Sequence, residues 1–162
     1  FYIFLIFYHM RILITIIFTL SFSSINAETC QWWFQRYGWK NFTLSKVEQC
    51  LKNGSPVIPD VDGGESPLHI AAEVNNDPEV LLRLIRAGAE INGTTKKGWT
   101  PLHSAARFNP NPEILLTLID AGADIDAKTN SGKTFIFWME KNSKLKKTIG
   151  YLELINLYDL SK

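Results

Sequence analysis

The chain contains few of the side chains that most often bind metals or act as catalytic nucleophiles. Its 162 residues include 2 cysteines and 3 histidines. A structural zinc site takes four ligands, mostly cysteine or histidine, and no second cysteine pair or nearby histidine completes such a set around Cys30 and Cys50. The acidic group Asp120, Asp124 and Asp126 lacks the ligand spacing, the glycine and the closing glutamate of a calcium loop. We therefore expect neither a metal nor a cofactor.

An excess of charge of one sign is also missing. Lys and Arg total 17 and Asp and Glu total 16, so the formal net charge is +1. Nucleic-acid-binding domains usually carry a marked basic excess, and we expect no nucleic-acid partner. One basic group occurs near the C-terminus, and we interpret it as a solvated end of the fold rather than a nucleic-acid or lipid patch. It consists of Lys141, Lys144, Lys146 and Lys147.

A catalytic constellation is absent from the sequence as well. His69 and His103 lie three residues after Ser66 and Thr100, respectively, which brings a hydroxyl near each ring. Nucleophilic catalysis also needs an acidic residue that orients the histidine and a positioned nucleophile. The sequence contains no such set of residues at a spacing typical of an active site, so we predict that the protein is not an enzyme.

The N-terminal residues form the longest apolar stretch of the chain. Residues 1–22 are almost wholly apolar, Arg11 follows Met10, and the small Ala27 closes the segment. A basic start, an apolar core and a small final residue are typical of a secretory signal peptide. We expect translation to begin at Met10, residues 1–9 to be upstream sequence, and the mature protein to be periplasmic or secreted.

An uncleaved membrane anchor is the alternative interpretation of the same segment. Residues 1–22 are long enough to span a bilayer. Arg11 lies near their middle, where a charge is costly, and this argues against the anchor. Membrane association is therefore expected only if the leader is not removed.

Export has a consequence for the two cysteines. An exported chain enters an oxidising compartment, where an even number of cysteines commonly pairs. A bridge between Cys30 and Cys50 closes a short loop, which would stabilise the fold by about 3 kcal/mol. Two free thiols, or half of a metal site, are the alternatives.

Three pairs of similar segments recur in one register. Most of their differences are conservative changes such as Ser to Thr, Asp to Asn and Val to Ile, and each pair is 34 residues apart. Matches at a fixed period of this length indicate a repeat architecture. The pairs are 66–72 with 100–106, 77–80 with 111–114, and 87–92 with 121–126.

Each repeat predicts a short helix, a tight loop and a longer helix. Pro67 suits the first turn of the short helix, where its missing N–H is not needed. Asp77 is a suitable N-cap for the second helix and Pro78 a suitable first residue. Apolar residues at helical spacing follow, and Gly88 suits the left-handed turn that ends the helix. In the same register Thr43 is expected to cap an earlier helix that carries Val47, Cys50 and Leu51.

The segment Thr-Pro-Leu-His-Ser-Ala at 100–105 matches the signature of the ankyrin repeat. The chain resembles a small ankyrin-repeat domain, and in particular the exported bacterial ankyrin-repeat proteins. The resemblance implies an all-α repeat fold, a short solenoid of helix–loop–helix units with β-hairpin-like tips and degenerate capping repeats at both ends. The predicted parts are a leader at 1–27, a disulfide-stapled capping repeat at 28–59, repeats at 60–93 and 94–127, and a C-terminal capping repeat at 128–162. We expect this last repeat to end in an amphipathic helix from roughly Lys144 to Leu160.

The resemblance also implies a function. Such repeats bind proteins through hairpin tips, here 62–64, 95–99 and 130–133, and through the faces of the first helices. Exposed aromatic and arginine side chains are enriched in binding hot spots. The candidate partner-binding residues are Lys97, Trp99, Glu73, Val74, Arg107 and Phe108. Packing of Trp99 along its neighbouring tip, and of Phe108 against the proline loop, is the alternative.

The two histidines have a structural role in this interpretation. In ankyrin repeats the residue at the position of His69 and His103 ties the hydroxyl residue to the backbone of the adjacent hairpin. We predict a monomeric, non-catalytic scaffold with an unknown protein partner. An accessory subunit of an envelope enzyme, or a secreted effector that acts on a host protein, is the alternative function.

Overall fold

The computed structural model describes Cys30, Trp33 and residues 36–58 and 64–160. The chain divides into two compact units, Phe1–Gln31 and Trp32–Lys162, and nearly all described residues belong to the second. The predicted signal peptide, the start at Met10 and the alternative anchor at 1–22 lie outside the described residues, as does most of the tip at 62–64. No helix in the described part of the chain is long and apolar enough to cross a membrane.

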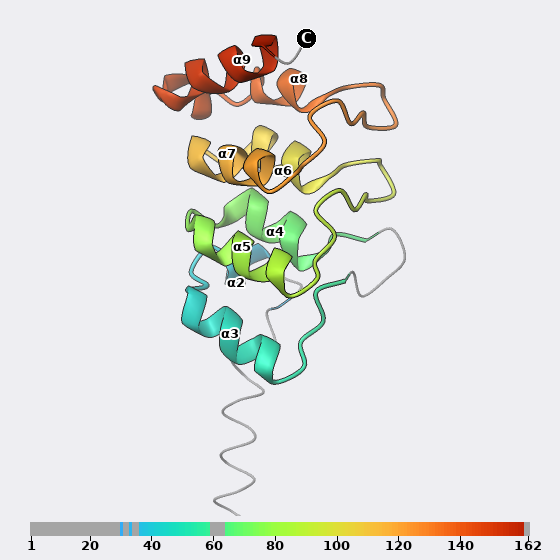
Figure 1. The fold of residues 1–162 in the computed structure, drawn as a ribbon, viewed down its shortest axis with the longest axis vertical. Helices are drawn as coiled ribbons and strands as arrows, with labels where there is room; N and C mark the ends of the chain where they lie inside the picture. Colours follow the sequence, from blue (N-terminus) through green and yellow to red (C-terminus); the bar gives the residue numbers. More distant parts are fainter. Residues whose placement is uncertain (1–29, 31–32, 34–35, 59–63, 161–162) are drawn as a thin grey trace, which may run out of the picture. The chain divides into compact units, whose positions relative to one another are not determined.

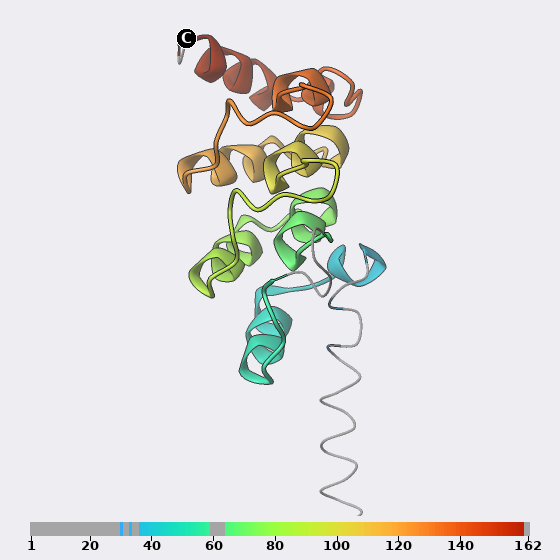
Figure 2. The same cartoon turned by 90° about the vertical axis from the view of Figure 1, so that its right-hand side faces the viewer.

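The second unit is a stack of paired helices (Figure 1). The inner row consists of the first helix of each pair and the outer row of the second, and helices of one row pack on their neighbours along the stack (Figure 2). The inner row is α2 (Arg36–Trp39), α4 (Pro67–Val74), α6 (Pro101–Phe108) and α8 (Phe135–Met139). The outer row is α3 (Leu44–Lys52), α5 (Pro78–Arg86), α7 (Pro112–Asp120) and α9 (Gly150–Leu160).

Side chains adjacent to the helices determine where the helices begin. Thr100 caps α6, and its hydroxyl accepts a hydrogen bond from the backbone N–H of His103. Asp77 caps α5 and accepts from the N–H of Glu79. A proline follows each of these caps at the first helical position, where its fixed φ suits the helix. Thr43 caps α3 in the same manner, so the predicted caps are confirmed.

Small and apolar side chains fill the space between the rows. Ala71, Ala72, Ala105 and Ala106 have no exposed surface, which lets α4 and α6 approach closely. The outer helices contribute apolar stripes at helical spacing, all without exposed surface. These stripes are Val80, Leu81 and Leu84 on α5 and Ile114, Leu115 and Leu118 on α7.

The tips between the pairs are tight turns, and the described residues contain no β-strand. The N–H of Thr95 donates to the carbonyl of Trp99 at 2.9 Å, which closes the tip at 95–99. The next tip lies against it, because the N–H of Asn130 donates to the carbonyl of Lys97 at 3.1 Å. Gly98 has φ +72, and a Cβ there would lie 2.5 Å from Oδ1 of Asn130. This contact between tips therefore requires glycine.

Three buried asparagines connect consecutive repeats. Asn75, Asn109 and Asn142 are 2%, 0% and 4% exposed. Nδ2 of Asn109 donates to the carbonyls of Ala72 at 3.0 Å and Asn75 at 2.7 Å, and its Oδ1 accepts from the N–H of Asn111 at 2.9 Å. We call this series the asparagine ladder. By sequence pattern alone, the first two of these residues belong only to the loops that end the inner helices.

The other two members of the ladder bond in the same way. Asn75 donates to the carbonyls of Trp39 and Phe42 at 2.7 and 2.8 Å. Asn142 donates to the carbonyls of Ala106 and Asn109 at 3.1 and 2.7 Å. Each side chain thus satisfies two carbonyls of the preceding repeat, and buried polar groups need such partners.

Aromatic rings close the N-terminal end of this unit. The rings of Trp33 and Phe42 flank Trp39, each at 4.9 Å between centroids, and Nε1 of Trp39 donates to the carbonyl of Trp33 at 2.6 Å. Cys30 and Cys50 are both disulfide-bonded. Because the chain has no other cysteine, they form the predicted bridge with each other.

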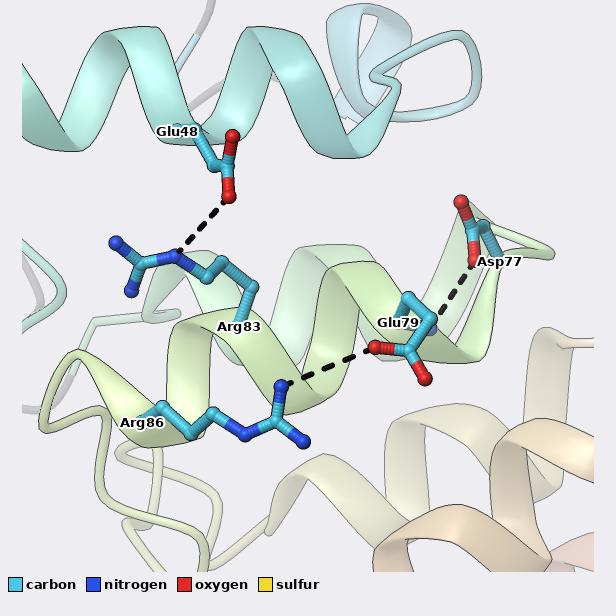
Figure 3. A network of polar contacts seen from close by, with 5 residues as sticks. All are labelled: Glu48, Asp77, Glu79, Arg83 and Arg86. Carbon is cyan, nitrogen blue, oxygen red and sulfur yellow. Dashed lines mark hydrogen bonds and ion pairs between the residues drawn. The ribbon is translucent and has the colours of Figure 1, made fainter.

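Charged side chains on the outer helices form the described ion pairs. Nε of Arg83 lies 3.8 Å from Oε1 of Glu48 and joins α5 to α3, and Nη1 of Arg86 lies 3.9 Å from Oε2 of Glu79 (Figure 3). Exposed pairs of this kind contribute about 0–1 kcal/mol each. They are accessory to the buried amides and apolar stripes.

The C-terminal end differs from the prediction. The sequence predicts a continuous helix from about 144 to 160, but a 3-10 turn at Leu145–Lys147 precedes α9, which begins at Gly150. A Cβ on Gly150 would lie 2.5 Å from Cγ of Pro112. The start of α9 therefore packs on the first turn of α7, and the non-helical residues 148 and 149 separate it from the 3-10 turn.

We predict that Asn109→Ala lowers the free energy of unfolding by about 3 kcal/mol, because it leaves two buried carbonyls and one N–H without a partner. Asn111→Ala is the matched control. It removes an N-cap two residues away and is expected to cost about 1 kcal/mol. Urea unfolding followed by circular dichroism measures both, and equal losses would contradict the ladder's role.

Candidate partner-binding surface

Four aromatic rings from three separate elements meet on the inner-helix side. Trp99 comes from a tip, Phe108 from α6, and Phe137 and Trp138 from α8. The Trp99 ring stacks on Phe108 at 5.9 Å and 25°, and it lies 4.7 Å from Trp138. Phe137 meets Trp138 edge-on at 5.1 Å. We call these residues the aromatic cluster.

A small pocket opens beside the aromatic cluster. Its volume is about 140 Å³, and it is lined by Glu65, Thr95, Lys97, Trp99, Ser104 and Phe108. Phe108 is 44% exposed, while Trp99 is half-buried. Large aromatic surface next to a pocket provides the kind of anchor on which protein interfaces depend.

Four of the six predicted binding residues gather here. Lys97, Trp99 and Phe108 line the pocket. The guanidinium of Arg107 lies 5.4 Å from the centroid of the Phe108 ring, and Nη1 donates to the carbonyl of Lys141 at 3.4 Å. The structure thus places Trp99 and Phe108 against each other, whereas the sequence pattern indicates two separate positions.

The remaining two residues are placed differently. Glu73 is 8% exposed, so the expectation that it presents an exposed face is wrong. α4 packs on both α2 and α6, and this double contact leaves little of its inner face open. Val74 is half-buried and does not line the pocket.

Sequence reasoning missed the contribution of α8. Phe137 and Trp138 depart from the repeat pattern, yet they complete the aromatic cluster. Trp138 lies 34 residues after Ser104, and Lys133 lies 34 residues after Trp99. Continuing the 34-residue period into the C-terminal capping repeat would have placed Trp138 and Lys133 on the same face as Ser104 and Trp99. Nε1 of Trp138 is buried and has no hydrogen-bond partner among the described residues.

The histidines at equivalent repeat positions hold the tips in place. Nε2 of His69 lies 2.9 Å from the carbonyl oxygen of Trp99, and Nε2 of His103 lies 3.1 Å from that of Lys133. Because a carbonyl accepts only, Nε2 carries the proton in both rings. Each histidine thereby fixes the backbone of a residue on the candidate surface.

The other ring nitrogen of each histidine is also occupied. Nδ1 of His69 accepts from the backbone N–H of Ser66 at 3.2 Å and lies 2.8 Å from its hydroxyl oxygen. Thr100 and His103 repeat this arrangement. The position that a carboxylate would take in a catalytic triad is occupied by a backbone carbonyl. Among the described residues, no group of three or more His, Cys, Asp or Glu is placed to hold a metal ion.

Burial favours the uncharged form of both histidines. It lowers the pKa of His69 below the ordinary 6.5, although the carbonyl of Trp99 and the charge of Glu65 act in the opposite direction. Burial likewise lowers the pKa of His103, against the effect of the Lys133 carbonyl. A second proton would sit on Nδ1, which faces a backbone N–H donor.

We predict that stability falls as the pH drops below 6.5, the ordinary histidine pKa. The unfolded chain takes up protons at that point, whereas the folded histidines resist protonation. The stabilisation is therefore complete above this pH and is lost as the pH falls toward the lowered folded pKa values. Urea unfolding from about pH 7.5 to about pH 5 measures the slope. The variant His69→Gln/His103→Gln should show a shallower slope, and an unchanged slope would contradict the assignment.

Comparison with known proteins agrees with this architecture. A family model described as ankyrin repeats (3 copies) matches residues 39–129, which is more than half of the chain. A search of curated proteins found no significant match. Ankyrin repeats generally mediate protein–protein interaction and are typically non-catalytic modules. The match, the paired helices and the repeated Pro-Leu-His turns show that the chain belongs to the ankyrin-repeat family.

Proposed function

We propose that this chain is an exported scaffold that binds a protein partner on the aromatic cluster and the adjoining tips. The observation that carries the proposal is the contact of the Trp99 ring with both Phe108, on which it stacks, and Trp138. The three rings come from three elements, so their arrangement depends on the folded stack of repeats. Part of this aromatic surface stays open to solvent, since Phe108 is 44% exposed.

The rigidity of the surface supports binding. His69 holds the carbonyl of Trp99, and His103 holds that of Lys133. Asn130 joins the two tips through its hydrogen bond to Lys97. Ordering loops on association reduces affinity, and a preorganised surface avoids much of this cost. The scaffold thus presents its aromatic residues in a defined geometry before a partner arrives.

Export is the second part of the proposal. The support is the leader-like composition of residues 10–27 together with the disulfide-bonded state of Cys30 and Cys50. Disulfides persist in oxidising compartments and are rare in reducing ones. We place the mature protein in the periplasm or outside the cell, with anchoring through residues 1–22 as the alternative.

We predict that Trp99→Ala/Phe108→Ala weakens partner binding by at least about 100-fold, since hot-spot truncations cost about 2 kcal/mol or more each. The partner is first identified by affinity purification with the tagged full chain from its native source. Calorimetry with the purified partner then measures affinity. The backbone carbonyl that His69 needs remains in Trp99→Ala, so the fold is expected to persist.

The matched control removes two exposed apolar side chains elsewhere. Ile58→Ala/Leu152→Ala truncates residues that are 56% and 65% exposed and do not belong to the aromatic cluster. We expect its affinity to stay within about twofold of the unaltered chain. Equal affinity of both double variants would contradict the surface assignment.

We predict that the chain expressed from Met10 in a bacterial host accumulates outside the cytoplasm with Glu28 as its first residue, because a signal peptidase cleaves after a small residue such as Ala27. N-terminal sequencing of the extracytoplasmic fraction measures the cleavage site. Intact mass after alkylation without reduction should show no blocked thiol. A product that keeps residues 10–27, or two alkylated cysteines, would contradict export with pairing.

A further inference from the structure

We propose that the partner segment bound at the aromatic cluster is acidic, with carboxylates that meet Lys133, Lys141 and Arg107 beside an apolar side chain held by the rings. The three basic residues are called the cationic cluster. The inference rests on the proposed function, because it names the chemistry of the partner at the same surface.

The cationic cluster is built around the aromatic rings. Nζ of Lys133 lies 4.6 Å from the centroid of the Phe137 ring, and Nζ of Lys141 lies 5.5 Å from it. Arg107 is joined to the carbonyl of Lys141 and lies over Phe108. Two ammonium groups at one ring repel each other, and a bound anion would offset that repulsion.

The ion pairs that the structure describes do not include the basic residues of the cationic cluster. These pairs lie on α3 and α5. Glu140 precedes Lys141 in the chain and forms no described ion pair with it. The charge of Glu140 adds to the effect of burial in raising the pKa of the Tyr151 phenol. Both lysines are exposed, so a carboxylate from solvent or from a partner can reach them and form charge-assisted hydrogen bonds.

A hydrogen-bond donor inside the aromatic cluster also lacks an acceptor. Nε1 of Trp138 is buried without a partner among the described residues, and a buried unpaired N–H is costly. The adjacent Trp99 ring contacts Trp138 at 4.7 Å. A carboxylate or carbonyl oxygen of the partner that reached this N–H would satisfy it.

Negative and positive charges lie on different sides of the candidate surface. Glu65 lines the pocket on the side of the first tip, whereas the cationic cluster lies at α8 and the end of α6. The acidic residues of a bound segment are therefore expected to point toward α8. Single-stranded nucleic acid also combines stacking with negative charge. The net charge of only +1 and the general role of ankyrin repeats in binding proteins favour an acidic protein segment instead.

The test selects random 12-residue peptides, displayed on phage, on the immobilised full chain. Synthetic versions of the enriched peptides are then titrated by tryptophan fluorescence at low and high salt. We expect the enriched peptides to contain Asp or Glu next to an aliphatic or aromatic residue. Their affinity should fall by about tenfold or more in Lys133→Glu/Lys141→Glu, with a weaker dependence on salt.

The matched control is Lys46→Glu/Lys52→Glu, which makes the same change in net charge on the exposed side of α3. We expect its peptide affinity to stay within about twofold, because separated surface charges are screened by salt. Circular dichroism melting of both charge-reversed variants verifies that they are folded. Equal losses in the two variants would overturn the local assignment of the acidic partner.

The outcomes separate this inference from the proposed function. Neutral or basic peptides that lose binding in Trp99→Ala would overturn the acidic partner and leave the proposed surface in place. Peptides that bind independently of Trp99, or no enrichment of any peptide, would overturn both. A thymidine oligonucleotide that displaces the peptides and binds more tightly than they do would replace the acidic protein segment with single-stranded nucleic acid.

Discussion

Buried asparagine amides join each repeat to the one before it. Asn109 reaches back to two carbonyls at the end of α4, and Asn142 does the same at the end of α6. The ends of inner helices leave carbonyls without intrahelical partners, and in a stack these ends are inaccessible to water. The asparagine ladder satisfies those carbonyls and, through Oδ1, the start of the following loop. The spacing between inner helices, and the surface formed on them, depends on these hydrogen bonds.

The histidines act on the other end of the same helices. Each ring spans from the start of its inner helix to the backbone of the next tip, so His69 positions Trp99 and His103 positions Lys133. The ladder and the histidines together fix both ends of the inner row. The aromatic cluster then forms from residues of α6, α8 and a tip through contacts between the rings alone. In this way the buried polar side chains of the stack hold the proposed binding surface in place.

Local sequence patterns predict much of the fold. Thr43, Asp77 and Asn111 are recognisable as caps because each precedes a run of apolar residues at helical spacing. Asn109 is not recognisable as a core residue, since a polar side chain beside prolines is typical of a loop and the two carbonyls to which it donates lie 34 or more residues away. The burial of Glu73 escapes prediction for a related reason, because it follows from the helices on both sides of α4.

The sequence by itself determined the ankyrin-repeat family, the helix–loop–helix units, their caps and the residues that were candidates for binding. These properties depend on interactions between residues close together in the chain, and the residues responsible for them recur after 34 positions. Only the tertiary structure decided which candidates share a surface. Trp99, Phe108 and Trp138 come together because stacking places equivalent positions of successive repeats side by side. The geometry of that stacking depends on buried contacts that no single repeat contains.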